Sequence, residues 1–306
     1  FILVSLVFYQ HSTLNNFINI PLGIAVILLV IFKLKGEWAE AKGEKFDWIG
    51  SIIYAASLFG IMYGLSRMPS QSGYVFLSLG LLVLVAFILL ERKLDYPVLD
   101  LRLFTKNRVF AFSNMAALIN YSATFAITFM LSLYLQFVKG LSPRDAGLIL
   151  VAQPIMMAVF SPLAGRLSDR VDARWLASLG MAITVVGLSI LAFFNADTSQ
   201  LSIVLSLIIL GFGFGIFSSP NTNAVMSSVE KKYLGIASAS LSTMRLTGQM
   251  FSMGIAMLVI NIFIGEATIN PSNFPDFLIA MKILFLTFSF LCLIGVFASL
   301  ARGKAD

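Results

Sequence analysis

Residues 165–174 read Gly-Arg-Leu-Ser-Asp-Arg-Val-Asp-Ala-Arg, and they carry five charges between two long apolar stretches at 146–164 and 175–194. Each flanking stretch has the length of a spanning helix, because the hydrocarbon layer is about 30 Å thick and a helical residue rises about 1.5 Å. Gly165 permits a close turn. The segment therefore predicts a surface loop that joins two membrane-spanning helices.

Further apolar stretches lie on both sides of this loop. The nine predicted spans are 18–34, 48–66, 74–90, 109–138, 146–164, 175–194, 201–220, 237–264 and 277–300. They are apolar in long blocks without strict alternation, which indicates helices and not the strands of a transmembrane barrel. We therefore expect an all-α polytopic membrane protein.

The composition agrees with this expectation. Hydrophobic residues make up 58% of the 306 residues and charged residues 12%, whereas soluble domains have about 45–50% and about 25%. These values exclude a disordered chain, a nucleic-acid-binding domain and a disulfide scaffold, since Cys292 is the single cysteine. The expected partner is the lipid bilayer and not nucleic acid.

The basic residues indicate the orientation of the spans. Sixteen of the 21 lysines and arginines fall in alternate loops and the C-terminal tail, whereas three fall in the opposite loops, and Arg245 and Lys282 lie within spans. Cytoplasmic loops carry the excess of positive charge, so we expect a multi-pass protein of the cell membrane with a cytoplasmic C-terminus. Residue 1 then lies outside, and Phe1–Tyr9 predicts the end of a truncated helix. If the intact protein also starts in the cytoplasm, an odd number of helices is expected to be missing.

The predicted spans lack the groups that most intramembrane enzymes need. All fifteen acidic residues fall in loops or at span ends, and the only histidine, His11, lies in a loop. Metal and haem sites need His, Cys or carboxylate ligands. We therefore expect no cofactor, no metal, no catalytic residues and no enzymatic activity.

Arg245 is the most informative residue within a span. An arginine at the bilayer centre costs about 2.5–3.5 kcal/mol on insertion scales, so it is usually functional or paired. One helix face carries Ser238, Ser242, Arg245, Gln249 and Ser252, at spacings of 4, 3, 4 and 3. We interpret this stripe as the lining of a cavity or gate. The alternative is that Arg245, about 10 Å beyond Ser238, extends its charge to the cytoplasmic surface.

A second polar face lies on the span at 109–138. It carries Asn114, Tyr121, Thr124 and Thr128, at spacings of 7, 3 and 4. Such side chains hydrogen-bond either a substrate or a neighbouring helix. Asn114, Tyr121 and Thr124 are therefore candidates for a substrate cavity, with helix packing as the commoner alternative.

Two further patterns concern helix shape. Gln153-Pro154 predicts a kink in the span at 146–164, because proline removes a backbone hydrogen bond. The run Gly211-Phe-Gly213-Phe-Gly215 and the pair Gly60 and Gly64 predict close contacts between helices.

The charged loop also carries a motif. Asp169 is expected to precede a helix start, where a carboxylate accepts backbone N–H groups. Arg170 and Arg174 lie one helical turn apart and can reach carboxylates or terminal carbonyls. Gly165, Leu167, Asp169 and Arg170, in this loop of a six-helix half, resemble the signature loop of the major facilitator superfamily.

Three further stretches resemble the 14-span drug:proton antiporter branch of that superfamily. Phe17–Gly23 looks like the entry to its sixth helix. Asp47–Gly50 and Pro97–Phe104 look like the borders of its two extra central helices. Gly235–Ser238 with Arg245 is similar to its thirteenth helix. The nine spans would then be helices six to fourteen, with five missing, which is an odd number.

The resemblance implies a division of the chain into three parts. Residues 1–34 would end the N-terminal transporter half, 35–108 would form a central two-helix hairpin with its linkers, and 109–306 would be the C-terminal six-helix half. It also implies proton-coupled efflux of amphipathic drugs or similar small molecules by alternating access. Because no acidic residue lies in the middle of a span, the proton-carrying acid is expected in the missing N-terminal half.

The resemblance also implies roles for individual residues. Gly165, Asp169, Arg170 and Arg174 would form a conformational latch at the cytoplasmic ends of the helices, and Arg245 would line the central cavity. Position 172 holds aspartate where the family usually has glycine, which puts the latch geometry in question. The alternatives are transport of another solute, such as a lipid, a siderophore or a metabolite, and a membrane scaffold that transports nothing.

Overall fold

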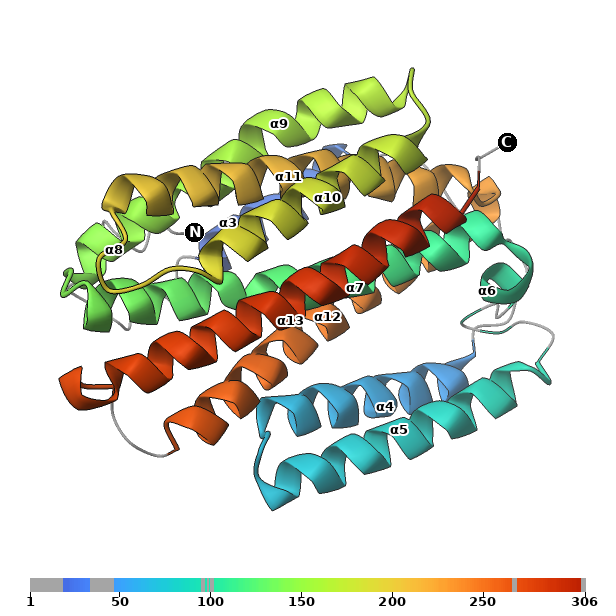
Figure 1. Ribbon diagram of the computed structural model, residues 1–306. Coiled ribbons are helices and arrows are strands. Elements are labelled where there is room, and N and C mark those ends of the chain that lie inside the picture. Colours follow the sequence, from blue (N-terminus) through green and yellow to red (C-terminus); the bar gives the residue numbers. More distant parts are fainter. Residues whose placement is uncertain are drawn as a thin grey trace.

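A computed structural model describes residues 19–33, 47–94, 97, 99, 102–265 and 269–303, and within these ranges the chain is helical without strands (Figure 1). The elements in chain order are α3 (Asn19–Lys33), α4 (Trp48–Ser66), α5 (Gln71–Glu91), α6 (Arg102–Lys106), α7 (Arg108–Leu133), the π-helical turn η1 (Tyr134–Val138), α8 (Pro143–Leu150), α9 (Ala152–Ser168), α10 (Ala173–Leu191), α11 (Gln200–Ser227), the 3₁₀ turn η2 (Lys231–Tyr233), α12 (Leu234–Phe263), the 3₁₀ turn η3 (Pro271–Asn273) and α13 (Phe274–Ala301).

The predicted spans agree closely with these helices. Eight helical segments of the described residues are long and apolar enough to cross a membrane, and they match the eight predicted spans from 48–66 to 277–300. The predicted span at 18–34 corresponds to α3, which is apolar but has 15 residues. The predicted truncated helix at Phe1–Tyr9 lies outside the described residues.

Short polar residues fix where the long helices begin. The side-chain oxygens of Ser70, Asn107, Ser142 and Ser199 each accept a backbone N–H in the first turn of α5, α7, α8 and α11. A capping side chain satisfies one of the N–H groups that have no partner within the helix. The loop residues therefore set the helix starts, while the apolar blocks set the helix lengths.

The six spans from α7 to α13 form one bundle, and the α4–α5 hairpin packs beside it. In this bundle α7 packs against α12 and α13, α10 lies between α11 and α13, and α9 packs against α11 (Figure 1). Fully buried core residues include Leu131, Met181, Leu207 and Phe285.

The glycine contacts between helices that the sequence predicts are confirmed. A Cβ on Gly60 would lie 2.8 Å from the Cα of Gly80, so α4 and α5 approach backbone to backbone. A Cβ on Gly213 would lie 2.8 Å from the carbonyl oxygen of Gly180, at the contact of α10 with α11. Only glycine permits such an approach without a shift of one helix.

The helix break before Pro154 is also confirmed. Helix α8 ends at Leu150 and α9 begins at Ala152, so the span at 146–164 is interrupted at Val151. Pro154 has no N–H to offer to the preceding turn, and its ring disfavours a straight helix. The break allows α9 to follow α11 at its own angle.

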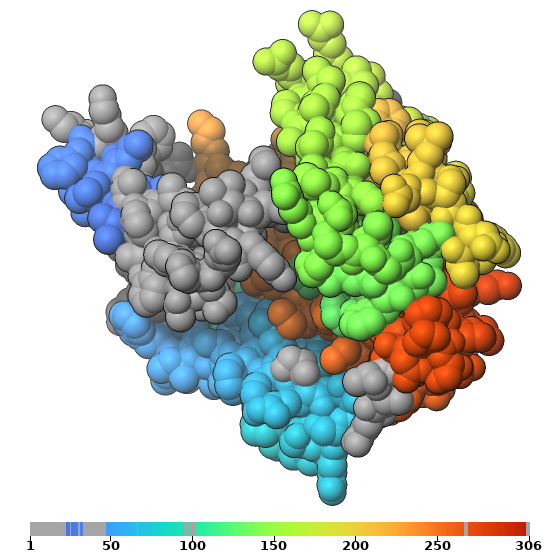
Figure 2. Space-filling view, turned by 90° about the vertical axis from the view of Figure 1, so that its left-hand side faces the viewer, coloured from blue at the N-terminus to red at the C-terminus, as the bar shows by residue number. Residues whose placement is uncertain are grey.

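The two ends of the bundle differ in charge. One end, on the right of Figure 1, holds the 165–174 loop, α6 and the end of α13, and we call it the basic end because it carries Arg102, Lys106, Arg166, Arg170 and Arg302. Figure 2 views the opposite end, where the start of α13 lies between α8 and the turn of the α4–α5 hairpin.

Candidate functional site

Arg245 joins three helices in the interior of the bundle. It lies eleven residues after the start of α12, or about 17 Å from the basic end of that helix. Its Nη2 donates a hydrogen bond to Oγ1 of Thr222 on α11, at 2.6 Å. Its guanidinium carbon lies 5.7 Å from the ring centroid of Tyr121 on α7. The Nε–H is buried and has no hydrogen-bond partner among the described residues.

An aromatic pair extends this cluster. The ring of Tyr121 meets that of Phe214 on α11 edge to face, with centroids 5.2 Å apart. Helix α12 reaches Tyr121 because Gly248 lies one turn after Arg245. A Cβ on Gly248 would lie 2.6 Å from the carbonyl oxygen of Leu118 and 3.0 Å from Cβ of Tyr121. Gly248 therefore sets the distance between α7 and α12 at the arginine.

The stripe on α12 changes from exposed to buried along the helix. Ser238 and Ser242 are exposed, Arg245 and Gln249 are half-buried, and Ser252 is fully buried. The Oγ of Ser252 accepts the backbone N–H of Ala126 on α7 at 2.9 Å. Ser252 thus serves helix packing, whereas the part of the stripe from Ser238 to Gln249 is exposed or half-buried.

The structure brings Tyr121, but not Asn114 or Thr124, to Arg245. Asn114 is buried, and its Nδ2 donates to the carbonyl of Phe110 in its own helix. Thr124 is also buried, and its Oγ1 donates to the carbonyl of Asn120. In this structure the hydrogen bonds of both side chains lie within α7, and neither side chain bonds Arg245.

Two of the four residues of the predicted latch, Asp169 and Arg170, line a pocket at the basic end. The pocket has a volume of about 650 Å³ and lies between the 165–174 loop and the end of α11, with Asp169 and Arg170 among its lining residues. Both are exposed, and neither forms a hydrogen bond or ion pair with another described side chain. Asn223 Nδ2 donates to Ser168 Oγ at 2.7 Å and ties the loop to α11. Gly165 faces α11, because its Cβ would lie 2.6 Å from Ser219 Oγ.

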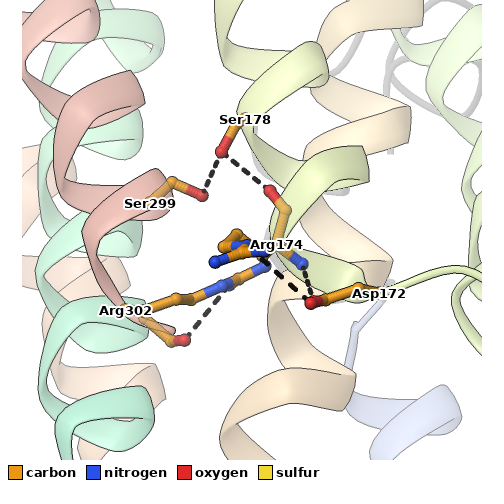
Figure 3. Close-up of polar contacts among 6 residues, drawn as sticks. Asp172, Arg174, Ser178, Ser299 and Arg302 are labelled. Carbon is orange, nitrogen blue, oxygen red and sulfur yellow. Dashed lines mark hydrogen bonds and ion pairs between the residues drawn. The ribbon is translucent and has the colours of Figure 1, made fainter. Parts of the chain in front are cut away.

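The residue that caps α10 is Asp172, and the expectation that Asp169 precedes the helix start is wrong. Helix α9 continues to Ser168, so Asp169 lies at its C-terminal cap and the turn to α10 ends at Asp172. Asp172 Oδ1 accepts the N–H of Arg174 at 2.8 Å, and its Oδ2 lies 3.7 Å from Arg174 Nε (Figure 3). The aspartate that departs from the family pattern therefore has a structural role.

Arg302 is buried, although its position in the sequence indicates only a basic residue of the C-terminal tail. It follows the last residue of α13, is 1% exposed, and points toward the start of α10 where Asp172 and Arg174 lie (Figure 3). Its Nη1 donates to Ser113 Oγ on α7 and Asn221 Oδ1 on α11, each at 3.2 Å. Burial lowers the pKa of Arg302 to about 10. Nearby Asp172 opposes this shift, and Arg174 adds to it.

No signal in a single sequence distinguishes Arg302 from an exposed tail arginine. Its partners lie 189 and 81 residues away along the chain. Their proximity arises from the packing of α7, α11 and α13. The bond between Ser178 Oγ and Ser299 Oγ, at 2.9 Å, holds α10 to α13 just before Arg302 (Figure 3).

The chemistry of the Arg245 cluster is that of binding. A guanidinium with a free N–H, hydroxyls and aromatic faces can hold a hydrogen-bond acceptor and a flat apolar group together. Within the described ranges, no three His, Cys, Asp or Glu side chains lie together as a metal site requires. The all-helical bundle and the eight apolar segments of the described residues define a polytopic membrane protein, and the cluster lies between its helices.

Comparisons with known proteins identify the family. Residues 113–304 match the sequence model of the family described as Major Facilitator Superfamily. This range is more than half of the chain. The chain therefore belongs to the major facilitator superfamily and is a multi-pass membrane protein. It is also similar in fold to the nucleoside transporter NupG, with a TM-score of 0.52 at 15% identity over 83% of this chain and 64% of that one.

Several curated relatives are transporters. The riboflavin transporter RibZ of Clostridioides difficile is 30% identical over 91% of this chain and 61% of its own length. Multidrug resistance protein 3 of Bacillus subtilis is 28% identical over 78% of this chain and 48% of its own length. The multidrug resistance protein Stp of Mycobacterium tuberculosis is 25% identical over 83% and 48%. The chain thus spans about half to three fifths of the length of these relatives.

Proposed function

We propose that this chain belongs to a proton-coupled exporter of amphipathic drugs or similar small molecules. In this proposal it is the part that corresponds to helices six to fourteen of the 14-span branch. Two multidrug resistance proteins among its relatives support the substrate class. The observation that carries the proposal is Arg245, a half-buried arginine deep in α12 that contacts Tyr121 and keeps an unpaired N–H.

The uneven burial of the bundle supports an opposing transporter half. In the most apolar part of α10 and of α11, 50% of the residues are buried. The corresponding shares are 22% for α12 and 17% for the segment that contains α8 and α9. The exposed side of α12 includes Ser238 and Ser242, which are poor groups to present to lipid. We infer that a second half covers this side and that the two halves enclose a wet pathway.

The Arg245 cluster would form one wall of that pathway. The guanidinium would hold an acceptor group of the substrate, and Tyr121 and Phe214 would contact its flat apolar part. Gln249 and Ser242, on the same helix face, would add hydrogen bonds. Asn114 and Thr124 could join only if α7 rotated, because their side chains now bond their own helix.

The 165–174 loop would act at the cytoplasmic side. Asp169 and Arg170 are exposed beside a pocket, so both charges are available to pair with the opposing half when the basic end closes. Arg174 would hold the start of α10 through Asp172. The basic end would face the cytoplasm of the cell membrane, as its positive charge indicates.

The residue that carries the proton would lie outside this chain. Each predicted span lacks an acidic residue near its middle. An arginine does not release its proton at physiological pH. The proton-carrying carboxylate is therefore proposed in the helices of the opposing half. Arg245 would respond to that carboxylate through its charge.

A vesicle experiment with the intact protein tests the proposal. A pH gradient would be imposed across inverted membrane vesicles, and the uptake of a fluorescent amphipathic drug that carries hydrogen-bond acceptors, such as norfloxacin, would be followed. We expect uptake that stops when an ionophore removes the gradient. Arg245→Ala, at unchanged expression, should lower the uptake to that of vesicles without the protein. Arg166→Ala, which removes an exposed basic residue from the end of α9, is the matched control. Equal uptake by Arg245→Ala and wild type would exclude a central role for Arg245.

A second candidate substrate is a flavin. RibZ is a riboflavin transporter by name and is 30% identical to this chain. The Tyr121–Phe214 pair beside a guanidinium suits a flat ring system with acceptor atoms. Radiolabelled riboflavin in the same vesicles separates the two substrates. Riboflavin flux that norfloxacin does not inhibit would favour the flavin.

A further inference from the structure

Gln153 is the second residue of α9 and follows the break between α8 and α9. The break lies beside the two helices that carry the aromatic pair, because α8 contacts α7 and α11, and α9 packs along α11 (Figure 1). The backbones of α9 and α11 are close here, since a Cβ on Gly211 would meet the carbonyl oxygen of Gln153. Gly211 lies three residues, or about 4.5 Å, before Phe214. Gln153 is therefore at the depth of the aromatic pair.

The side-chain amide of Gln153 is enclosed but unpaired. The residue is only 8% exposed. Neither amide atom has a hydrogen-bond partner among the described residues, and neither is completely sealed from its surroundings. Buried amides are normally hydrogen-bonded, because an unpaired amide has lost its bonds to water without replacement. The amide of Gln153 therefore has room for a partner that the described chain does not supply.

That partner is not the lipid. Ile155 and Val159, which are each 53% exposed, mark the lipid-facing side of α9. Ile155 follows Gln153 by two residues, and two residues turn a helix by about 200°. Gln153 thus lies on the side of α9 that is turned toward α11 and away from lipid. An amide in contact with lipid would also find no hydrogen-bond partner there.

The chemistry of an amide differs from that of the guanidinium of Arg245. A guanidinium only donates hydrogen bonds, whereas the Nε2 of a glutamine donates and its Oε1 accepts. The best partner for a glutamine is therefore a group that has an N–H next to a C=O, as in a lactam or a cyclic imide. Two hydrogen bonds to one such edge fix the orientation of a ring as well as its position. Gln153 and Arg245 would thus select different edges of one flat molecule.

We propose that Gln153 is a specificity-determining residue of the substrate site and binds the N–H/C=O edge of a flat heterocycle. The ring packs against the aromatic pair, and Arg245 binds acceptor atoms elsewhere on the same molecule. This inference rests on the proposed function, because it needs the Arg245 cluster to line the pathway. It adds a substrate class, namely heterocycles with a lactam or imide edge. Riboflavin has such an edge, since its imide N–H lies between two carbonyl groups.

The binding of two flavins to the purified intact protein tests the inference. The fluorescence of riboflavin and of 3-methylriboflavin, in which a methyl group replaces the imide hydrogen, is titrated with protein in detergent. We expect the wild type to bind riboflavin about tenfold more tightly, because the methylated compound loses one hydrogen bond and leaves the amide unpaired. Gln153→Leu should bind riboflavin about tenfold more weakly and reduce the preference to less than twofold. It should change the affinity for norfloxacin, whose quinolone edge carries only acceptors, less than twofold.

Two control variants complete the test. Gln136 is a half-buried glutamine in η1 whose Nε2 already bonds Ser132, so Gln136→Leu should keep both the affinity and the preference. Arg245→Ala should weaken both flavins by the same factor and keep the preference. A wild-type preference below twofold, or an unchanged preference in Gln153→Leu, would overturn the role of Gln153.

The two levels of the proposal fail in different ways. Binding of norfloxacin but of neither flavin would overturn the inference and leave the proposed function standing. Binding of all three compounds by Arg245→Ala as tightly as by the wild type would overturn the proposed function, and with it the inference.

Discussion

Two arginines contact the same two helices and meet very different surroundings. Arg245 bonds Thr222, and Arg302 bonds Asn221, which is the preceding residue of α11. Arg245 is half-buried on the side of the bundle where α12 is poorly covered, whereas Arg302 is fully buried between α7, α11 and α13. Neighbouring residues of α11 therefore bond two arginines on different sides of the bundle. We call the poorly covered side at α12 the open side, and the side packed between α7, α11 and α13 the closed side. Under the proposed function, burial, and not residue type or spacing, separates the binding role of Arg245 from the structural role of Arg302.

The largest expected contrast follows from truncating each arginine. Arg302→Ala leaves Ser113 Oγ and Asn221 Oδ1 without their donor and opens a cavity, so we expect a loss of about 3 kcal/mol in the free energy of unfolding. Arg245→Ala should cost less than about 1 kcal/mol, because water can reach part of its surroundings. The measurement is the thermal unfolding midpoint of each purified variant in the same detergent.

The contrast extends to transport. Arg245→Ala should remove the flux and keep the fold. Arg302→Met keeps most of the buried volume, so it should recover part of the stability that Arg302→Ala loses. If both alanine variants lose the same unfolding free energy, the distinction between an open and a closed side is wrong.

The sequence predicts the helical frame well because its signal is local. Blocks of apolar residues mark the spans, Ser70, Asn107 and Ser199 mark the starts of their helices, and Pro154 marks the break between α8 and α9. Each of these effects acts within one or two helical turns. The helical frame therefore needs no knowledge of tertiary contacts.

The site is predicted less completely because it depends on which helix faces which. The spacing on α12 indicates a polar face that includes Arg245, and the structure places the ring of Tyr121 5.7 Å from the guanidinium carbon of that arginine. The spacing on α7 also groups Asn114 and Thr124 with Tyr121, yet both bond their own helix. Periodicity defines a face of a helix but not the neighbour of that face. For Arg302, the contacts to α7 and α11 arise only in the packed bundle.

The contact between α7 and α12 gives an intermediate expected effect. In Gly248→Ala the new methyl group would meet the carbonyl of Leu118 at 2.6 Å, so the two helices must separate. We expect a loss of about 2 kcal/mol in unfolding free energy and a severalfold loss of flux, since Arg245 moves away from Tyr121. Gly235→Ala on the same helix is the matched control, because its Cβ has no neighbour within 4 Å. That variant should be neutral or more stable by about 0.5–1 kcal/mol. A harmless Gly248→Ala would show that Gly248 does not set this distance.

The smallest expected effect concerns the turn that lies between the two sides. Both aspartates line the same pocket, but Asp172 is half-buried and caps α10, whereas Asp169 is exposed. Asp172→Ala should lower the unfolding free energy by about 1 kcal/mol, because Arg174 N–H loses its acceptor, and Asp172→Gly should cost about 0.3 kcal/mol. Asp169→Asn should leave the unfolding midpoint unchanged and alter only the flux, because the carboxylate bonds no described side chain. Unfolding midpoints and vesicle flux, measured on the same three variants, separate the cap from the latch. A shift in stability for Asp169→Asn equal to that for Asp172→Ala would mean that both aspartates hold the turn and that the loop has no free charge for an opposing half.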